Sequence, residues 1–266
     1  MSDLSQDTKD AAELISGVLA RPEDVLPGII NLLPVAERPF FPGQVMPLVL
    51  DGDTWMETLK NSHENHRNIL GLVYTGGAAD ADTDSGVDHI RRIGTACRIH
   101  QVQQHDSSLH VVLVGLERFE IREWVNRSRP FAARVEYFPE TRSEDSTEIK
   151  AYTTAIINVI KELLPLNPLY GEELKQFLNH FGPNEPARLA DFGASLTTAN
   201  AAELQEVLET LPLYPRLEKT LVLLQKELEI ARAQMEIREH VEREMQDRQR
   251  EVFLREQLKF IHKELG

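Results

Sequence analysis

Several short stretches have residue types and spacings that could support chemistry, and the first is a possible phosphate loop. GLVYTGGA, residues 71–78, has glycines at the spacing of a P-loop. Gly77 and Ala78 stand where that loop needs Lys and then Ser or Thr, and without the lysine no side chain reaches the β- and γ-phosphates. The stretch therefore predicts the end of a strand and a turn.

A second stretch has the start of a calcium-binding loop. In DADTDSGVDHIR, residues 80–91, Asp80, Asp82 and Asp84 occupy positions 1, 3 and 5. Glycine is at position 7 instead of 6, and Arg91 takes position 12, where the loop needs a bidentate Glu. We expect a solvated loop that binds no metal.

Histidine, cysteine and serine give no stronger signal. His100, His105 and His110 could be imagined as metal ligands, but no HExxH motif occurs and alternation along strands explains their spacing. The single cysteine, Cys97, lies in the strand-like run GTACRIHQV, which predicts a buried, inert thiol in a reducing compartment. No GxSxG motif is present. The residues alone predict no catalytic, cofactor or metal site.

Composition bounds the remaining possibilities. The chain has 266 residues, 41% of them hydrophobic, and a net charge of −14, so it can bury a sizeable core in one or two domains. The acidic balance disfavours nucleic-acid binding, because neutralising phosphates requires clustered Lys and Arg. No run approaches the roughly 20 apolar residues of a membrane span, and residues 1–28 read as a flexible polar arm without the basic start of a secretory signal. We expect a cytoplasmic protein with no membrane partner.

Up to about residue 138 the pattern is that of short strands. The β-branched and aromatic runs are residues 28–35, 44–50, 67–74, 94–104, 109–124 and 131–138. One helix interrupts them at 53–65, with Asp53 or Thr54 as its cap and Trp55, Met56 and Leu59 facing inward. This pattern predicts an antiparallel, partly closed barrel over residues 29–142.

From about residue 143 the pattern becomes helical. Helices are expected in an all-α bundle at 143–212, where Asn200 and Glu203 have the spacing of a capping box. A long helix then covers 213–266, with a heptad seam from Leu217 to Met235 that thins beyond Met235. At 1.5 Å per residue that helix is about 80 Å long, against about 40 Å for a compact domain of this size. The fold class is therefore α+β with a protruding helix, whose first third packs on the bundle.

Five stretches carry a resemblance to a known family. They are INLLPVAERPFFPGQVMPLVL (30–50), IRRIGTACRIHQV (90–102), HVVLVGLERFEI (110–121), PARLADFGAS (186–195) and MQDRQREVFLREQLKFIHKELG (245–266). Over about residues 29–266 the chain resembles the amino-terminal half of bacterial Lon proteases. The resemblance implies a PUA-like barrel and, in the parent protein, a hexameric ATP-dependent serine protease with an AAA+ motor, ATP and Mg²⁺, and a Ser–Lys dyad. The motor and dyad would lie beyond Gly266, so no catalytic residue is carried over to this chain.

The resemblance also implies partners, namely unfolded or tagged protein substrates and other Lon subunits. Binding unfolded chains calls for exposed, adaptable apolar surface, for which Met and aromatic side chains are suited. The candidate residues are Phe40, Phe41, Met46 and Trp55 in the barrel, and Met235 and Met245 on the long helix. Core packing is the competing explanation for each of them. A stand-alone adaptor or chaperone-like binder, with a barrel and a coiled coil but no motor, is the alternative function.

Overall fold

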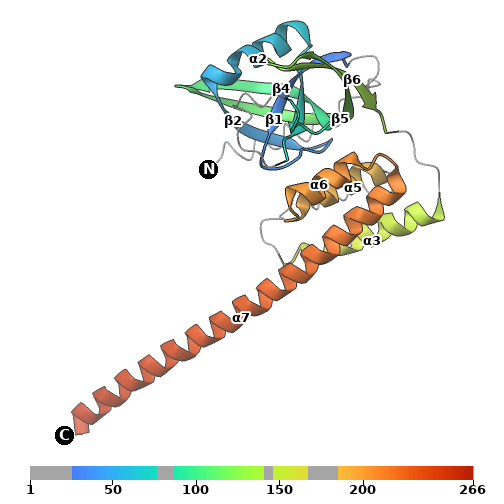
Figure 1. The fold of residues 1–266 in the computed structure, drawn as a ribbon. Coiled ribbons are helices and arrows are strands. Elements are labelled where there is room, and N and C mark those ends of the chain that lie inside the picture. The colour runs from blue at the N-terminus through green and yellow to red at the C-terminus, as the bar shows by residue number, and fades with distance from the viewer. Residues whose placement is uncertain (1–25, 77–86, 141–145, 167–184, 266) are drawn as a thin grey trace.

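A closed barrel and a helical bundle make up the part of the chain that a computed structural model describes, residues 26–76, 87–140, 146–166 and 185–265. The barrel sits on one side of the bundle, and one long helix runs from the bundle away from the barrel (Figure 1). The α+β class and the protruding helix are confirmed. Nearly all of the predicted arm at 1–28, residues 167–184 of the predicted bundle and most of the loop at 80–91 lie outside the described residues.

The barrel is a six-stranded sheet in the order β2-β5-β4-β3-β1-β6, closed by pairing of β5 with β6. Its strands are β1 (Ile29–Val35), β2 (Val45–Asp51), β3 (Ile69–Tyr74), β4 (Ile93–His105), β5 (Ser108–Asn126) and β6 (Ala132–Phe138). The expectation of an antiparallel sheet is wrong for one pair, because β1 and β3 run parallel. The chain crosses over between them through β2 and a helix, which is the connection that parallel neighbours require.

That crossover helix is α2 (Gly52–Asn65). Its cap is Asp51, whose carboxylate accepts from the Thr54 N–H at 2.9 Å, so the predicted cap at Asp53 or Thr54 was wrong. The inward face is confirmed: Leu59 is buried, and Trp55 and Met56 are half-buried against the barrel core.

The bundle consists of α3 (Thr147–Leu163), α5 (Pro186–Leu196), α6 (Ala201–Glu209) and the start of α7 (Leu213–Leu265). Asn200 and Glu203 form the predicted capping box at the start of α6. The apolar faces of α3, α5 and α7 meet in one core that includes Ile156, Leu189 and Leu224. The predicted domain division near residue 142 falls in an undescribed stretch and stays a prediction.

Helix α7 leaves the bundle part-way along its length. Leu217, Leu224 and Leu228 are buried, whereas every residue from 232 to 265 is exposed. The predicted end of the packed seam at Met235 was wrong, since that side chain is 42% exposed. The reason is the length of α3: Arg232 already pairs at 2.6 Å with Glu162 in its last turn, and no described helix continues beside α7.

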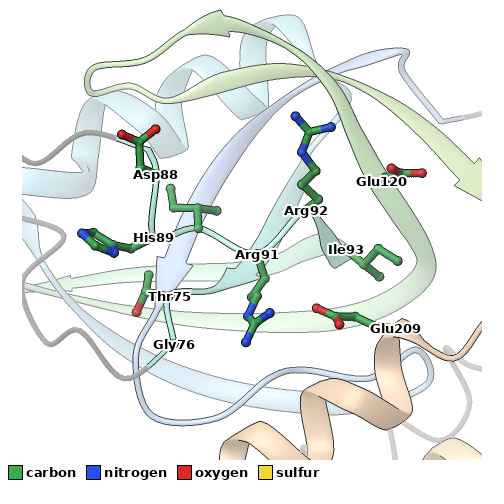
Figure 2. Close-up of a pocket in the computed structure, with 10 residues that line it drawn as sticks. Thr75, Gly76, Asp88, His89, Arg91, Arg92, Ile93, Glu120 and Glu209 are labelled. Atoms are coloured by element: carbon green, nitrogen blue, oxygen red, sulfur yellow. The ribbon is translucent and has the colours of Figure 1, made fainter.

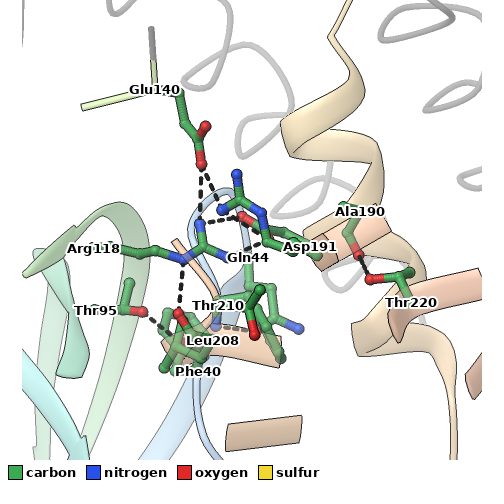
Figure 3. A network of polar contacts seen from close by, with 12 residues as sticks. Phe40, Gln44, Thr95, Arg118, Glu140, Ala190, Asp191, Leu208, Thr210 and Thr220 are labelled. Atoms are coloured by element: carbon green, nitrogen blue, oxygen red, sulfur yellow. Dashed lines mark hydrogen bonds and ion pairs between the residues drawn. The ribbon is translucent and has the colours of Figure 1, made fainter. Parts of the chain in front are cut away.

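Barrel and bundle are joined by buried charges. Arg118 on β5 donates through Nε to the Leu208 carbonyl of α6 at 3.1 Å and through both terminal nitrogens to the carboxylate of Asp191 on α5 (Figure 3). Arg216 on α7 brings Nη1 within 2.6 Å of Glu140 Oε1, just after β6. We call these residues, with Glu117 beside Arg118, the joint.

Apolar packing reinforces the joint at Phe41. The loop before β2 lies directly on β5 at Gly115, where an added methyl group would come within 2.5 Å of the Phe41 carbonyl oxygen. This close approach directs the Phe41 ring into a cluster with Leu204 and Leu208 of α6 and Leu223 of α7. The ring is fully buried, so the barrel and the bundle share part of one core.

Arg38 and Gln205 add hydrogen bonds to backbone carbonyls across the interface. Arg38 donates to the carbonyls of Ser195 and Thr197 at 3.0 and 2.9 Å, at the carboxyl end of α5, where a cation is favourable. Gln205 on α6 donates to the carbonyl of Ile93 on β4 at 3.0 Å. The barrel is thus held by contacts to α5, α6 and α7 together.

The change from packed to exposed helix in α7 can be tested with two alanine substitutions, one at a buried and one at an exposed position. Leu224→Ala removes a fully buried side chain and should lower the free energy of unfolding by about 2–5 kcal/mol. Met245→Ala removes an exposed one and should shift the melting temperature by no more than about 2 °C. Urea and thermal unfolding measure both, and equal effects would contradict this account of α7.

Candidate functional site

Two of the predicted substrate-contacting residues are structural. Phe40 is 3% exposed and lies in the barrel core, and Phe41 is 0% exposed in the joint. Their rings offer no surface to a ligand, so the prediction that they form an exposed apolar site is corrected. The physical reason is the loop on Gly115, which turns both aromatic rings inward.

Met46 and Trp55 are half-buried and face inward as well. Both pack on the core cluster that contains Phe40, so the structure does bring these three side chains together, but inside the barrel. Trp55 is also covered by the Arg129 guanidinium, 5.6 Å from the ring centroid. A substrate could reach only the rims of these side chains.

A group of apolar side chains at the barrel surface lies on the opposite face of β2. Side chains alternate along a strand, so Met46, Leu48 and Leu50 point inward while the residues between them point outward. Val45 of β2 pairs with Val114 of β5, and Pro47 pairs with Val112. Cross-strand partners lie on the same face of the sheet. The outer-face patch comprises Val45, Pro47, Val49, Val112 and Val114.

The outer-face patch is open and lies at an edge. Val49 is 66% exposed and Val45 is 36% exposed. Among the described residues β2 pairs only with β5, but Pro47 lacks an N–H in the middle of that edge, which discourages addition of another strand. A polypeptide would therefore bind here through its apolar side chains.

Sequence reasoning missed this patch, although a signal was present. A strand at a barrel surface normally alternates apolar with polar residues. The strand VMPLVLD instead has Val45, Pro47 and Val49 at the outward positions. Apolar residues on both faces of an edge strand mark the outer face as a candidate contact surface.

The exposed part of α7 carries the remaining candidates. Met235 is 42% exposed and Met245 is 57% exposed, as expected of a binding surface. Two apolar stripes follow this part of the helix. The first contains Val241, Met245 and Val252, and the second contains Leu254, Leu258, Ile261 and Leu265. Leu254 follows Met245 by nine residues, which at about 100° per residue places the stripes on opposite sides of the helix.

One hollow, of about 680 Å³, lies where β3, β4, β5 and α6 meet. Figure 2 shows Arg91 and Arg92 on its lining pointing away from each other, with Asp88, Glu120 and Glu209 around them. Charges of both signs point in different directions, so the hollow has no convergent set of groups for an anion. Among the described residues, no group of three His, Cys, Asp or Glu side chains could hold a metal ion.

Cys97 has the character predicted for it. The thiol is fully buried in the barrel, and this burial raises its pKa well above the usual value. A thiol that stays protonated is neither a nucleophile nor a metal ligand. No helix in the described part of the chain is long and apolar enough to cross a membrane.

Comparisons with known proteins agree with this architecture. Residues 29–226 match the family model described as the ATP-dependent protease La (LON) substrate-binding domain. The chain is 45% identical over 240 residues to Lon protease 2 of Hydrogenovibrio crunogenus, covering 90% of this chain and 27% of that protein. It is 41% identical over 261 residues to Lon protease 1 of Syntrophotalea carbinolica, covering 98% of this chain and 32% of that protein.

A solved structure shows the same fold at lower identity. The N-terminal domain of a Mycobacterium avium complex Lon protease superposes with a TM-score of 0.57 and 21% identity, covering 74% of this chain and 98% of that one. Because the family match spans most of this chain, the resemblance found in the sequence is confirmed. The chain belongs to the family of ATP-dependent protease La (LON) substrate-binding domains.

Proposed function

We propose that this chain is the substrate-recognition and substrate-delivery region of an ATP-dependent, Lon-type serine protease of the bacterial cytoplasm. The chain spans about a third of the length of its Lon protease relatives. In this proposal ATP and Mg²⁺, the AAA+ motor, the Ser–Lys dyad and the hexamer belong to the parent protein, and this region performs no chemistry. A stand-alone adaptor is not favoured, because the relatives are Lon proteases.

The outer-face patch is the observation that carries the proposal. Unfolded or tagged proteins expose apolar side chains that folded proteins bury. Covering apolar surface contributes roughly 25 cal/mol per Å², so an open patch favours such chains without requiring a defined sequence. The patch lies on two paired strands of the barrel, and contacts through a few apolar side chains suit weak binding that a motor can later overcome. The net charge of −14 disfavours nucleic acid as the ligand.

Helix α7 supplies the delivery part of the proposal. Its exposed portion is a straight spacer, held by the ion pairs Glu244–Arg248 and Glu251–Arg255 at 3.6 and 2.6 Å. The two apolar stripes on opposite sides would be covered by the motor and by neighbouring subunits. The helix would hold the patch at a fixed distance from the motor.

The patch predicts a loss of binding when its exposed valines become polar. In the double variant Val45→Ser/Val49→Ser, the dissociation constant for a reduced, alkylated and therefore unfolded protein should rise about tenfold, equivalent to about 1.4 kcal/mol. Fluorescence anisotropy of the labelled unfolded protein measures it.

Val102→Ser is the matched control, because Val102 is also exposed, at 44%, but pairs with the inward-facing Val111. Its dissociation constant should match that of the unchanged chain. If the control weakens binding as much as the double variant does, or the double variant binds normally, the patch is not the site.

The spacer role of α7 predicts separable effects in the full-length protein. Val241→Pro breaks the exposed helix, at about 3 kcal/mol relative to Ala, whereas Val241→Ala keeps it. We expect the proline variant to degrade folded proteins several-fold more slowly while its ATPase activity and its cleavage of short peptides stay normal. Loss of all three activities together, or loss of none, would show that α7 does not couple recognition to the motor.

A further inference from the structure

The joint contains one carboxyl group more than it contains guanidinium groups. Arg118 and Arg216, which are 1% and 0% exposed, are matched by Asp191 and Glu140 through ion pairs. Glu117, next to Arg118 on β5, is the additional acid and is 7% exposed. Its Oε1 is buried and has no hydrogen-bond partner among the described residues. A buried carboxylate oxygen without a partner is costly, and protonation removes that cost.

The surroundings of Glu117 favour its protonated form. Burial has the largest effect, and the negative charges of Glu140, after β6, and Asp191, on α5, act in the same direction. The positive charge of Arg118 and a hydrogen bond from its backbone N–H oppose them, but the guanidinium is already engaged with Asp191. Together they raise the pKa of Glu117 to about 7. Glu140 is 34% exposed and gives water a route to the joint.

We propose that the joint is a proton-sensitive latch, in which the carboxylate of Glu117 takes up one proton from water and the barrel then docks more tightly on the bundle. Protonation removes the unpaired negative charge and leaves two guanidinium groups facing two carboxylates. The latch would set how firmly the patch-bearing barrel is held to α7 within the range of pH found in cells. It does not depend on what the outer-face patch binds.

The direction of the pKa shift of Glu117 determines whether stability rises or falls with pH. An unfolded glutamate has a pKa of 4.5, below the value of about 7 in the folded chain. The contribution of Glu117 to stability is therefore fully present below pH 4.5 and is lost as the pH rises through about 7. Between pH 6 and pH 8 the equilibrium constant for folding should fall about tenfold because of this residue alone.

Glu117→Gln tests the latch, since it resembles the protonated acid in shape and cannot ionise. The stability of the unchanged chain should fall from pH 6 to pH 8 relative to that of the variant, by about tenfold in the folding constant. Urea unfolding at both pH values measures it.

His66, whose pKa is lowered by burial, makes a contribution to the pH dependence with the opposite sign. The comparison with the variant cancels this contribution. Glu123→Gln, 71% exposed on the same strand, is the control and should keep the pH dependence of the unchanged chain.

Hydrogen exchange then locates the effect. After correction for intrinsic rates, the amides of α5 and α6 should be better protected at pH 6 than at pH 8 in the unchanged chain, and this gain at pH 6 should be absent in Glu117→Gln. The same gain at pH 6 in the variant would overturn the latch.

An NMR titration of Glu117 tests the latch without any variant. The carboxyl ¹³C resonance of Glu117 in the unchanged chain should titrate with a midpoint near pH 7, and a midpoint below about 5 would overturn the proposal.

Discussion

The ion pair between Arg118 and Asp191 is the interaction on which the rest of the structure depends. Both side chains are almost completely buried, and removing a charge from water carries a penalty of several kcal/mol per ion. That penalty is offset only while the guanidinium keeps its carboxylate and its bond to the Leu208 carbonyl on α6. The barrel therefore cannot tilt on the bundle without leaving a buried charge unpaired. Phe41, packed into the same interface, adds an apolar contribution that requires the same geometry.

This constraint connects the surface that would bind a substrate to the helix that would deliver it. The outer-face patch lies on β2 and β5, and β5 also carries Arg118 into the bundle. On the other side of the interface, Arg216 and Glu227 tie α7 to Glu140 and to the turn before α6, where Glu227 accepts from the Thr198 N–H at 2.7 Å. A load on the patch thus reaches α7 through buried contacts. A rigid path of this kind suits a region that holds substrates above a motor, because a flexible one would let them drift away.

The elements could be predicted from the sequence because each of them rests on local periodicity. All six strands, helix α2 and the capping box at Asn200 were predicted where they occur. The joint could not be predicted, since Arg118 and Asp191 are far apart in the chain and charged residues are normally exposed. The parallel pairing of β1 with β3 and the burial of Phe41 depend in the same way on distant contacts. The site prediction favoured Met and aromatic residues, whereas the open surface consists of Val45, Pro47 and Val49, whose apolar outward positions were a readable but overlooked signal.

A double-mutant cycle on the joint tests the central claim, that one buried ion pair fixes the barrel to the bundle. Arg118→Met and Asp191→Leu each take the main partner from a buried charge and leave it only a longer contact, Asp191 with Arg216 at 3.8 Å or Arg118 with Glu140 at 3.3 Å. Each should lower the free energy of unfolding by about 3–5 kcal/mol. The double variant, which leaves neither charge, should recover most of that loss, giving a coupling energy of at least about 2 kcal/mol in urea unfolding. If the two single effects add to within about 0.5 kcal/mol, the pair does not hold the two parts together and the account is contradicted.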